Sequence, residues 1–320
     1  MSISNRNGRA LEFGYLLTLI AAAKLVPSIS IVVKENSSFL AAKEAWEAIP
    51  DEMQKTFLLS ATTGVKEILK AEPIILEQGY GDLEIEIQPD GAGKDGDVRD
   101  ILITRQGLQW EIGISVKNNH FAVKHSRLSR KLDFGYKWFG VKCSQQYWDD
   151  ISSVFQYLAE CKKKELTWNE LPSKENDVYI PLLSAFLAEI KRSYDIHGET
   201  LAKNMVEYLI GKYDFYKTIS VNNRRLTRLQ PYNLRGTLNR PSKKKHPKLI
   251  IPISALPTRI ISAEFKPHSN NTVEVFMDEG WQFGFRIHNA STKVETSLKF
   301  DIQIIGMPTS IICIDFKWDD

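Results

Sequence analysis

The chain has 320 residues, of which 43% are hydrophobic and 25% are charged, and its net charge is only +3. These values are typical of an ordinary globular protein with one large domain or two smaller ones. Its three cysteines are widely spaced and odd in number, which excludes zinc spacing and argues against a disulfide framework. We therefore expect a reducing, cytoplasmic setting. The most apolar N-terminal run, residues 13–23, is about half the length needed to span a bilayer, so no membrane segment is expected.

The small net charge is unevenly distributed. Residues 211–250 contain eleven Lys or Arg and one acid, and residues 105–142 contain eight against two. Phosphate binding depends on such local clusters more than on the total charge. Solubilising surface charge is the alternative explanation.

The N-terminal part reads as helices followed by strands. Asn5 or Asn7 can cap a helix that runs to about Lys24, and residues 38–48 and 51–71 also have helical patterns. Residues 83–87 alternate strictly between apolar and acidic, which predicts a strand with one buried face. A glycine-rich turn at residues 89–96 follows.

The stretch from residue 94 to residue 117 predicts a β-hairpin with charged residues at one end. Its first strand begins at Asp100, and its second strand ends at Lys117. Because the start of one strand lies beside the end of the other in a hairpin, the two side chains should meet. A carboxylate, a lysine and nearby acids form a plausible Mg²⁺ and phosphate site. Glu111, Gly113, Ser115 and Lys117 share the strand face without bulky apolar residues, which suggests an open, charged cleft.

Glu12 is the second acid that the pattern singles out. It precedes Leu16, Leu19, Ile20 and Ala23 on the apolar face of the first helix, where an unpaired carboxylate is costly. It is therefore either a metal ligand or orienting group, or an acid that favours the positive end of the helix dipole.

The remainder divides into a helical block and a β-rich part. Residues 118–142 mix basic and aromatic side chains, which suits a surface that tracks a nucleic-acid backbone. Residues 145–162, 178–192 and 198–209 read as helices. Strands are expected at residues 215–221, 249–253, 272–277, 281–288, 298–305 and 311–316, with a turn at 278–280. We predict a mixed α/β (α+β) fold with a core at 1–145, a helical block at 146–212, and a core-completing strand plus β-rich region at 213–320.

The order of helix, strand, strand with Asp100 and strand with Lys117 resembles the PD-(D/E)XK nuclease core. Four longer segments together resemble the HaeIII family of type II restriction endonucleases over nearly the whole chain. They are Gly8-Arg9-Ala10-Leu11-Glu12, Gly96-Asp97-Val98-Arg99-Asp100, residues 111–129 from Glu111-Ile112-Gly113 to Arg127-Leu128-Ser129, and Phe285-Arg286-Ile287-His288-Asn289-Ala290-Ser291. The resemblance implies Mg²⁺-dependent cleavage of double-stranded DNA at GGCC, between the central G and C, to give blunt ends.

One position departs from the general nuclease motif. Ser115 stands where the motif carries Asp or Glu, and a serine hydroxyl is a weak ligand for a hard cation. Glu111 on the same strand face is roughly 13 Å away and too far to replace it. We expect Asp100, Ser115, Lys117 and Glu12 to form the catalytic site. Asp100, Glu12 or Asp97 and the carbonyl of Val116 would hold one or two Mg²⁺ ions. Asp133, from the following segment, ranks behind Glu12 and Asp97 as the extra acid.

Guanine is read best by Arg or Lys, and the cytosine amino group by an acid or carbonyl. Several basic and polar residues are candidates for base reading or phosphate contacts. They are Lys124, His125, Arg127, Arg130, Arg224, Arg225, Arg228, Arg235, Arg240, Gln282, Arg286, His288, Asn289 and Lys293.

A palindromic target favours a homodimer, although a monomer that cuts one strand at a time stays open. A restriction enzyme also implies a cognate DNA methyltransferase in the same cell. The competing interpretations are a structure-specific repair nuclease of the same fold and a DNA-binding protein whose nuclease site has decayed.

Overall fold

The computed structural model describes residues 3–89, 96–119 and 123–319. The chain forms two compact units, each built from separate segments. Unit 1 comprises Met1–Phe121, Gly211–Ser254 and Thr309–Asp320, and unit 2 comprises Ala122–Ile210 and Ala255–Pro308. These interleaved segments differ from the three consecutive ranges predicted from the sequence, although the chain returns to unit 1 at Gly211, close to the boundary predicted between residues 212 and 213.

Unit 1 is built on a mixed sheet, seven-stranded within the described ranges. Its strands are β1 (Ile31–Lys34), β2 (Leu83–Ile87), β3 (Ile101–Arg105), β4 (Trp110–Asn118), β6 (Phe215–Val221), β7 (Leu226–Tyr232) and β12 (Ile314–Lys317). The spatial order is β1-β2-β3-β4-β6-β7-β12, in which the β1–β2 and β4–β6 pairs are parallel and the others are antiparallel. Strand β6 thus lies directly beside the predicted hairpin β3–β4.

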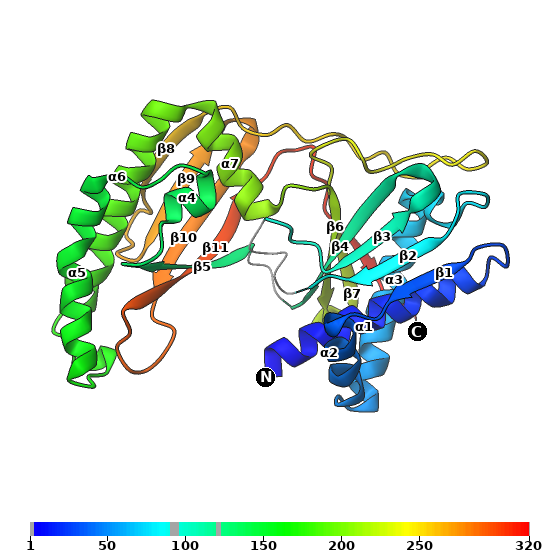
Figure 1. Cartoon of the computed structure of the whole chain (residues 1–320), viewed down its shortest axis with the longest axis horizontal. Coiled ribbons are helices and arrows are strands. Elements are labelled where there is room, and N and C mark those ends of the chain that lie inside the picture. Colours follow the sequence, from blue (N-terminus) through cyan, green and yellow to red (C-terminus); the bar gives the residue numbers. More distant parts are fainter. Residues whose placement is uncertain (1–2, 90–95, 120–122, 320) are drawn as a thin grey trace. The chain divides into compact units, whose positions relative to one another are not determined.

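In the described part of unit 1 the α-helices are α1 (Ile3–Lys24), α2 (Ser37–Glu47) and α3 (Asp51–Ala71) (Figure 1). Helix α1 packs on β4, and α3 packs on β6 and β7. Their apolar side chains share one core with Ile112, Ile114 and Val116 of β4. The opposite face of β4 therefore carries Ser115 and Lys117. The expected cap at Asn5 or Asn7 is wrong, because α1 already begins at Ile3 and both asparagines lie inside it.

Unit 2 contains an antiparallel sheet, five-stranded in the part of the chain described. Its strands, in spatial order, are β5 (Lys124–Ser129), β11 (Ser297–Gly306), β10 (Gln282–His288), β9 (Thr272–Met277) and β8 (Ile260–Phe265). Its helices are α4 (Phe134–Phe139), α5 (Gln145–Lys163), α6 (Ile180–His197) and α7 (Glu199–Ile210).

Aromatic side chains form the core of unit 2. Trp138 of α4 and Phe186 of α6 contact Phe285 and Phe300 on the inner face of the sheet. Phe134 and Trp138 are buried, so the prediction that these aromatics belong to a backbone-tracking surface is wrong. Their apolar area is removed from water by the helices instead.

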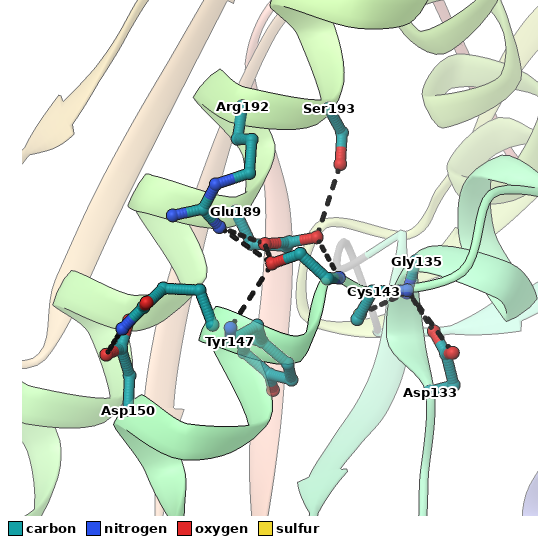
Figure 2. A network of polar contacts seen from close by, with 10 residues as sticks. Asp133, Gly135, Cys143, Tyr147, Asp150, Glu189, Arg192 and Ser193 are labelled. Carbon is teal, nitrogen blue, oxygen red and sulfur yellow. Dashed lines mark hydrogen bonds and ion pairs between the residues drawn. The ribbon is translucent and has the colours of Figure 1, made fainter.

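A network of hydrogen bonds and ion pairs connects α5 and α6 of unit 2 (Figure 2). Buried Glu189 of α6 accepts hydrogen bonds from Ser144 N at 2.7 Å, Ser144 Oγ at 2.6 Å and Arg192 Nη1 at 2.5 Å. Asp133 caps α4 and accepts from the backbone N–H groups of Tyr136 and Cys143. Asp133 thus has a structural role as a helix cap, which weakens its case as the replacement acid.

The described structure confirms most of the predicted elements and the mixed α/β class. Strands β2, β6 and β9 have the predicted bounds, and residues 278–280 connect β9 to β10. The expected strand at 249–253 is wrong, since these residues form no regular element. Most of the predicted glycine-rich turn at 89–96 lies outside the described residues. Within the described part, none of the helices is sufficiently long and apolar to span a membrane.

Candidate active site

Asp100 and Lys117 meet as the hairpin predicted. The Lys117 ammonium lies 2.9 Å from Asp100 Oδ2, and the side chains of Lys117 and Asp100 are 29% and 23% exposed. The same oxygen accepts hydrogen bonds from Val116 N at 2.6 Å and Ser115 Oγ at 3.2 Å. Three donors therefore hold one carboxylate oxygen, whereas the described residues donate no hydrogen bond to the other, Oδ1.

The strand register explains this geometry. Ile101 of β3 pairs with Ile114 of β4, which places Asp100 opposite Ser115. The Asp100 backbone is fixed on both sides, since its N–H donates to Ile114 O and its carbonyl accepts from Gln88 N, both at 2.9 Å. The carboxylate is consequently held at the end of the sheet before any ligand arrives.

Glu12 belongs to the electrostatic environment of Lys117. Burial lowers the pKa of Lys117, but the charge and hydrogen bond of Asp100 and the charge of Glu12 outweigh burial and raise the pKa above its usual value. Lys117 is therefore a cation at neutral pH, not a base. Of the acids expected to replace the missing carboxylate at position 115, Glu12 on α1 contributes to the electrostatics of the site through its effect on Lys117.

Asp97 belongs instead to an ion-pair cluster with Arg99. Its two oxygens accept hydrogen bonds from Arg99 Nε at 2.8 Å, Arg99 Nη2 at 2.7 Å and Gln88 Nε2 at 2.8 Å. Burial raises the pKa of Asp97, yet these hydrogen bonds overcome that effect and lower the pKa. Arg99 also donates to Glu111 at 2.7 Å. With both oxygens engaged, Asp97 is poorly placed to hold a metal.

Arg99 also corrects the expectation of an open face on β4. A Cβ atom added to Gly113 would lie 2.1 Å from Arg99 Cδ, so the arginine stem fills the space above this glycine. Gly113 and Ser115 are both buried. Gly113 and Ser115 are small because Arg99 occupies the space above this part of the face, and the face is exposed only at its two ends, at Glu111 and Lys117.

Lys217 was not among the predicted site residues. It lies on β6 in register with Ser115, so the two side chains share a face with Lys117. Its side chain is buried, at 7% exposure. Burial and the charge of Lys117 lower the pKa of Lys217 to about 8, although Asp100 and Cys313 partly offset them. The sequence signal was a single charge within the otherwise uncharged strand 215–221.

The donor set fits a divalent cation that brings its own water and substrate ligands. Among residues 3–89, 96–119 and 123–319, no three Asp, Glu, His or Cys side chains gather closely enough to enclose a metal. Mg²⁺ commonly uses one or two carboxylates and takes further oxygens from water and substrate phosphates. Asp100, with its second oxygen clear of described donors, together with nearby Glu12, meets that need.

The predicted DNA-binding residues are divided between the two units. Unit 1 contains Arg224, Arg225, Arg228, Arg235 and Arg240. Arg224 and Arg228 line a hollow of about 640 Å³ with Asn119 and Asn222, at the strand ends that follow Lys117 on β4 and Val221 on β6. Arg228 already makes a two-bond ion pair with Asp315, at 2.7 and 2.9 Å.

Unit 2 contains the other candidates: Lys124, His125, Arg127, Arg130, Gln282, Arg286, His288, Asn289 and Lys293. Arg127 and Arg286 are exposed, and Arg286 pairs with Asp301 at 3.2 Å. Lys124 is held internally, with its ammonium 2.8 Å from Tyr208 O. The Asn289 side chain bonds Tyr179 and Ser291 O, and Lys293 pairs with Glu165. The side chain of His125 lies outside the described residues.

Known proteins share sequence with nearly the whole chain. The model of the HaeIII restriction endonuclease family matches residues 8–308. The chain is 50% identical over 317 residues to the type II restriction enzyme HaeIII of Haemophilus aegyptius, covering 99% of each chain. No solved structure matches the chain.

Proposed function

Because the chain belongs to the HaeIII restriction endonuclease family, we propose that it is a type II restriction endonuclease that hydrolyses double-stranded DNA within one short sequence. The observation that carries the proposal is the Lys117–Asp100 contact at the sheet end. A carboxylate held by three donors beside a cationic lysine suits phosphodiester hydrolysis. The 50% identity to HaeIII supports GGCC as the target, with a blunt cut between the central G and C.

In this mechanism Asp100, Glu12 and the carbonyl of Val116 would hold a divalent cation, which we take to be Mg²⁺. When bound, it supplies positive charge that neutralises the scissile phosphate. Ser115 and the Val116 N–H orient the Asp100 carboxylate through its Oδ2 atom. Ser115 thus acts through Asp100 rather than as a ligand.

Lys117 orients the attacking water and stabilises the negative charge that develops at phosphorus. Its raised pKa supports this role over that of a general base. The water oxygen forms a bond to phosphorus and releases a proton to solvent, the ester bond from phosphorus to the leaving oxygen breaks, and that oxygen takes up a proton from solvent.

The exposed arginines of both units are the proposed contacts to DNA. Arg228 and Arg286 are held by Asp315 and Asp301, so their guanidinium groups are positioned before DNA binds. A homodimer that matches a palindromic site and a cognate methyltransferase in the cytoplasm complete the proposal.

The test is digestion of plasmid DNA with Mg²⁺, mapping of the cut ends, and repetition with GGCC-methylated DNA. We expect discrete blunt fragments from the wild-type protein and none from methylated DNA. Asp100→Ala and Lys117→Ala should abolish cleavage yet keep the fold and DNA binding. Full activity in either variant contradicts the site assignment. Cleavage by DNA structure instead of sequence would indicate a repair nuclease, and binding without cleavage a decayed enzyme.

A further inference from the structure

Lys217 is a buried cation whose charge is not balanced by a direct partner. In the described part of the chain, its ammonium group makes no hydrogen bond or ion pair, although the side chain is only 7% exposed. Its neighbours in register are Ser115 on β4 and Gln230 on β7, both neutral and both buried. Lys117, by contrast, is paired with Asp100 at 2.9 Å.

Such an arrangement does not serve stability. Burying most of a lysine side chain without a directly paired carboxylate is costly, and an apolar side chain of similar length would avoid the cost. Burial and the charge of Lys117 lower the pKa of Lys217 to about 8. The lowered pKa means that the protein environment disfavours the charged form of this lysine. Lys217 also lies on the same sheet face as the Asp100–Lys117 pair, and charged groups kept in unfavourable electrostatic surroundings are typical of functional sites.

We propose that Lys217 is the anion-binding cation of the active site and takes a non-bridging oxygen of the scissile DNA phosphate. This inference rests on the proposed nuclease function. Lys117 stays with Asp100 and the attacking water, so the two lysines divide the work. A charge without a direct partner in a partly desolvated site interacts more strongly with an incoming anion than a charge that is already paired.

The experiment compares Lys217→Met with Lys217→Arg, which keeps the charge, and with Lys43→Met. Lys43 is exposed on α2, so this control removes one positive charge from the surface of the same unit. Each protein is melted with and without orthophosphate, without divalent metal, and is then assayed for single-turnover cleavage with Mg²⁺.

We expect orthophosphate to raise the melting temperature of wild type and of Lys43→Met but not of Lys217→Met. The Met variant should fold at least as stably as wild type, whereas its cleavage rate should fall about 100-fold, the cost of losing one transition-state donor. Lys217→Arg should recover part of both effects.

An unchanged orthophosphate shift, or wild-type cleavage by Lys217→Met, would overturn the role of Lys217. If the wild-type protein cleaves no DNA, the proposed function fails. The orthophosphate measurement then still decides whether Lys217 binds an anion.

Discussion

The side chain of Arg99 packs closely on Gly113 and supports the local structure of the active site. The substitution Gly113→Ala tests this packing. An added Cβ would lie 2.1 Å from Arg99 Cδ, 2.4 Å from Cγ and 2.7 Å from Cβ. Because Arg99 Cβ itself is too close, a change of rotamer cannot relieve the clash. The backbone at Arg99 must move, and Asp100 is the next residue.

The expected cost has two parts. Overpacking a filled site costs about 1–3 kcal/mol. Displacing Arg99 also weakens its contacts with Asp97, and a buried pair that loses one partner costs at most about 3–5 kcal/mol. The side chains of Arg99 and Asp97 are 5% and 13% exposed, so solvent screens this pair little. Since Arg99 can keep part of its contacts, we expect a total loss of about 3 kcal/mol.

The assay is urea unfolding followed by tryptophan fluorescence, together with single-turnover cleavage. The control is Gly284→Ala on β10, where the added Cβ would meet Ile305 Cγ2 at an ordinary 3.5 Å. In an Arg99→Ala background, Gly113→Ala should cost little, because the obstructing stem is gone. A Gly113→Ala protein that unfolds within about 0.5 kcal/mol of wild type would refute the packing argument.

Three further predictions concern pH, DNA recognition and metal. Burial raises the pKa of Glu72 from 4.5 to about 7 despite hydrogen bonds from Tyr216 and the Asn239 and Arg240 backbone, so the folded state holds the proton more tightly than the unfolded state. The free energy of unfolding should therefore fall by about 3 kcal/mol as pH rises from 4.5 to 7. The measurement compares the unfolding free energies of wild type and Glu72→Gln at pH 5 and at pH 8. The same difference between the two proteins at both pH values would contradict this prediction. Arg286→Ala should weaken cognate binding by about 1–3 kcal/mol and binding to random DNA little, and equal losses in a titration would make Arg286 a phosphate contact. Chelation by EDTA should stop cleavage and leave the circular dichroism spectrum unchanged, and persistent cleavage would exclude a metal requirement.

Local periodicity predicted the elements that hold the site. The strict alternation of residues 83–87 and the apolar face of β4 arise from the same burial that builds the sheet, whereas every residue of β6 is buried. Among the described helices and strands, the sequence missed α4, β1, β5, β7 and β8. Strand β5 begins with Lys124 and pairs with β11, far away in the sequence, so only the folded chain shows why its basic residues adopt an extended conformation. Strand β7 contains Arg228 and Pro231, which interrupt the apolar pattern of a strand.

Side-chain partners were less predictable than the elements. The hairpin brought Asp100 to Lys117 as expected, because register alone places them together. Asp97 and Glu111 looked equally free in the sequence, yet Arg99 pairs with both. Such a choice depends on which side chain fills the space above Gly113, and one strand's pattern does not contain that information.

The two unexpected features of the site are linked by register. Ser115 stands where the nuclease motif carries an acid, and Lys217 lies directly beside it on β6. An acid at position 115 would face this lysine and neutralise it. With serine there, the hydroxyl instead helps to hold Asp100, and the positive charge of Lys217 is left for an anion that enters the site. The departure at Ser115 therefore does not by itself indicate a decayed nuclease, because it accompanies a second cation beside Asp100 and Lys117.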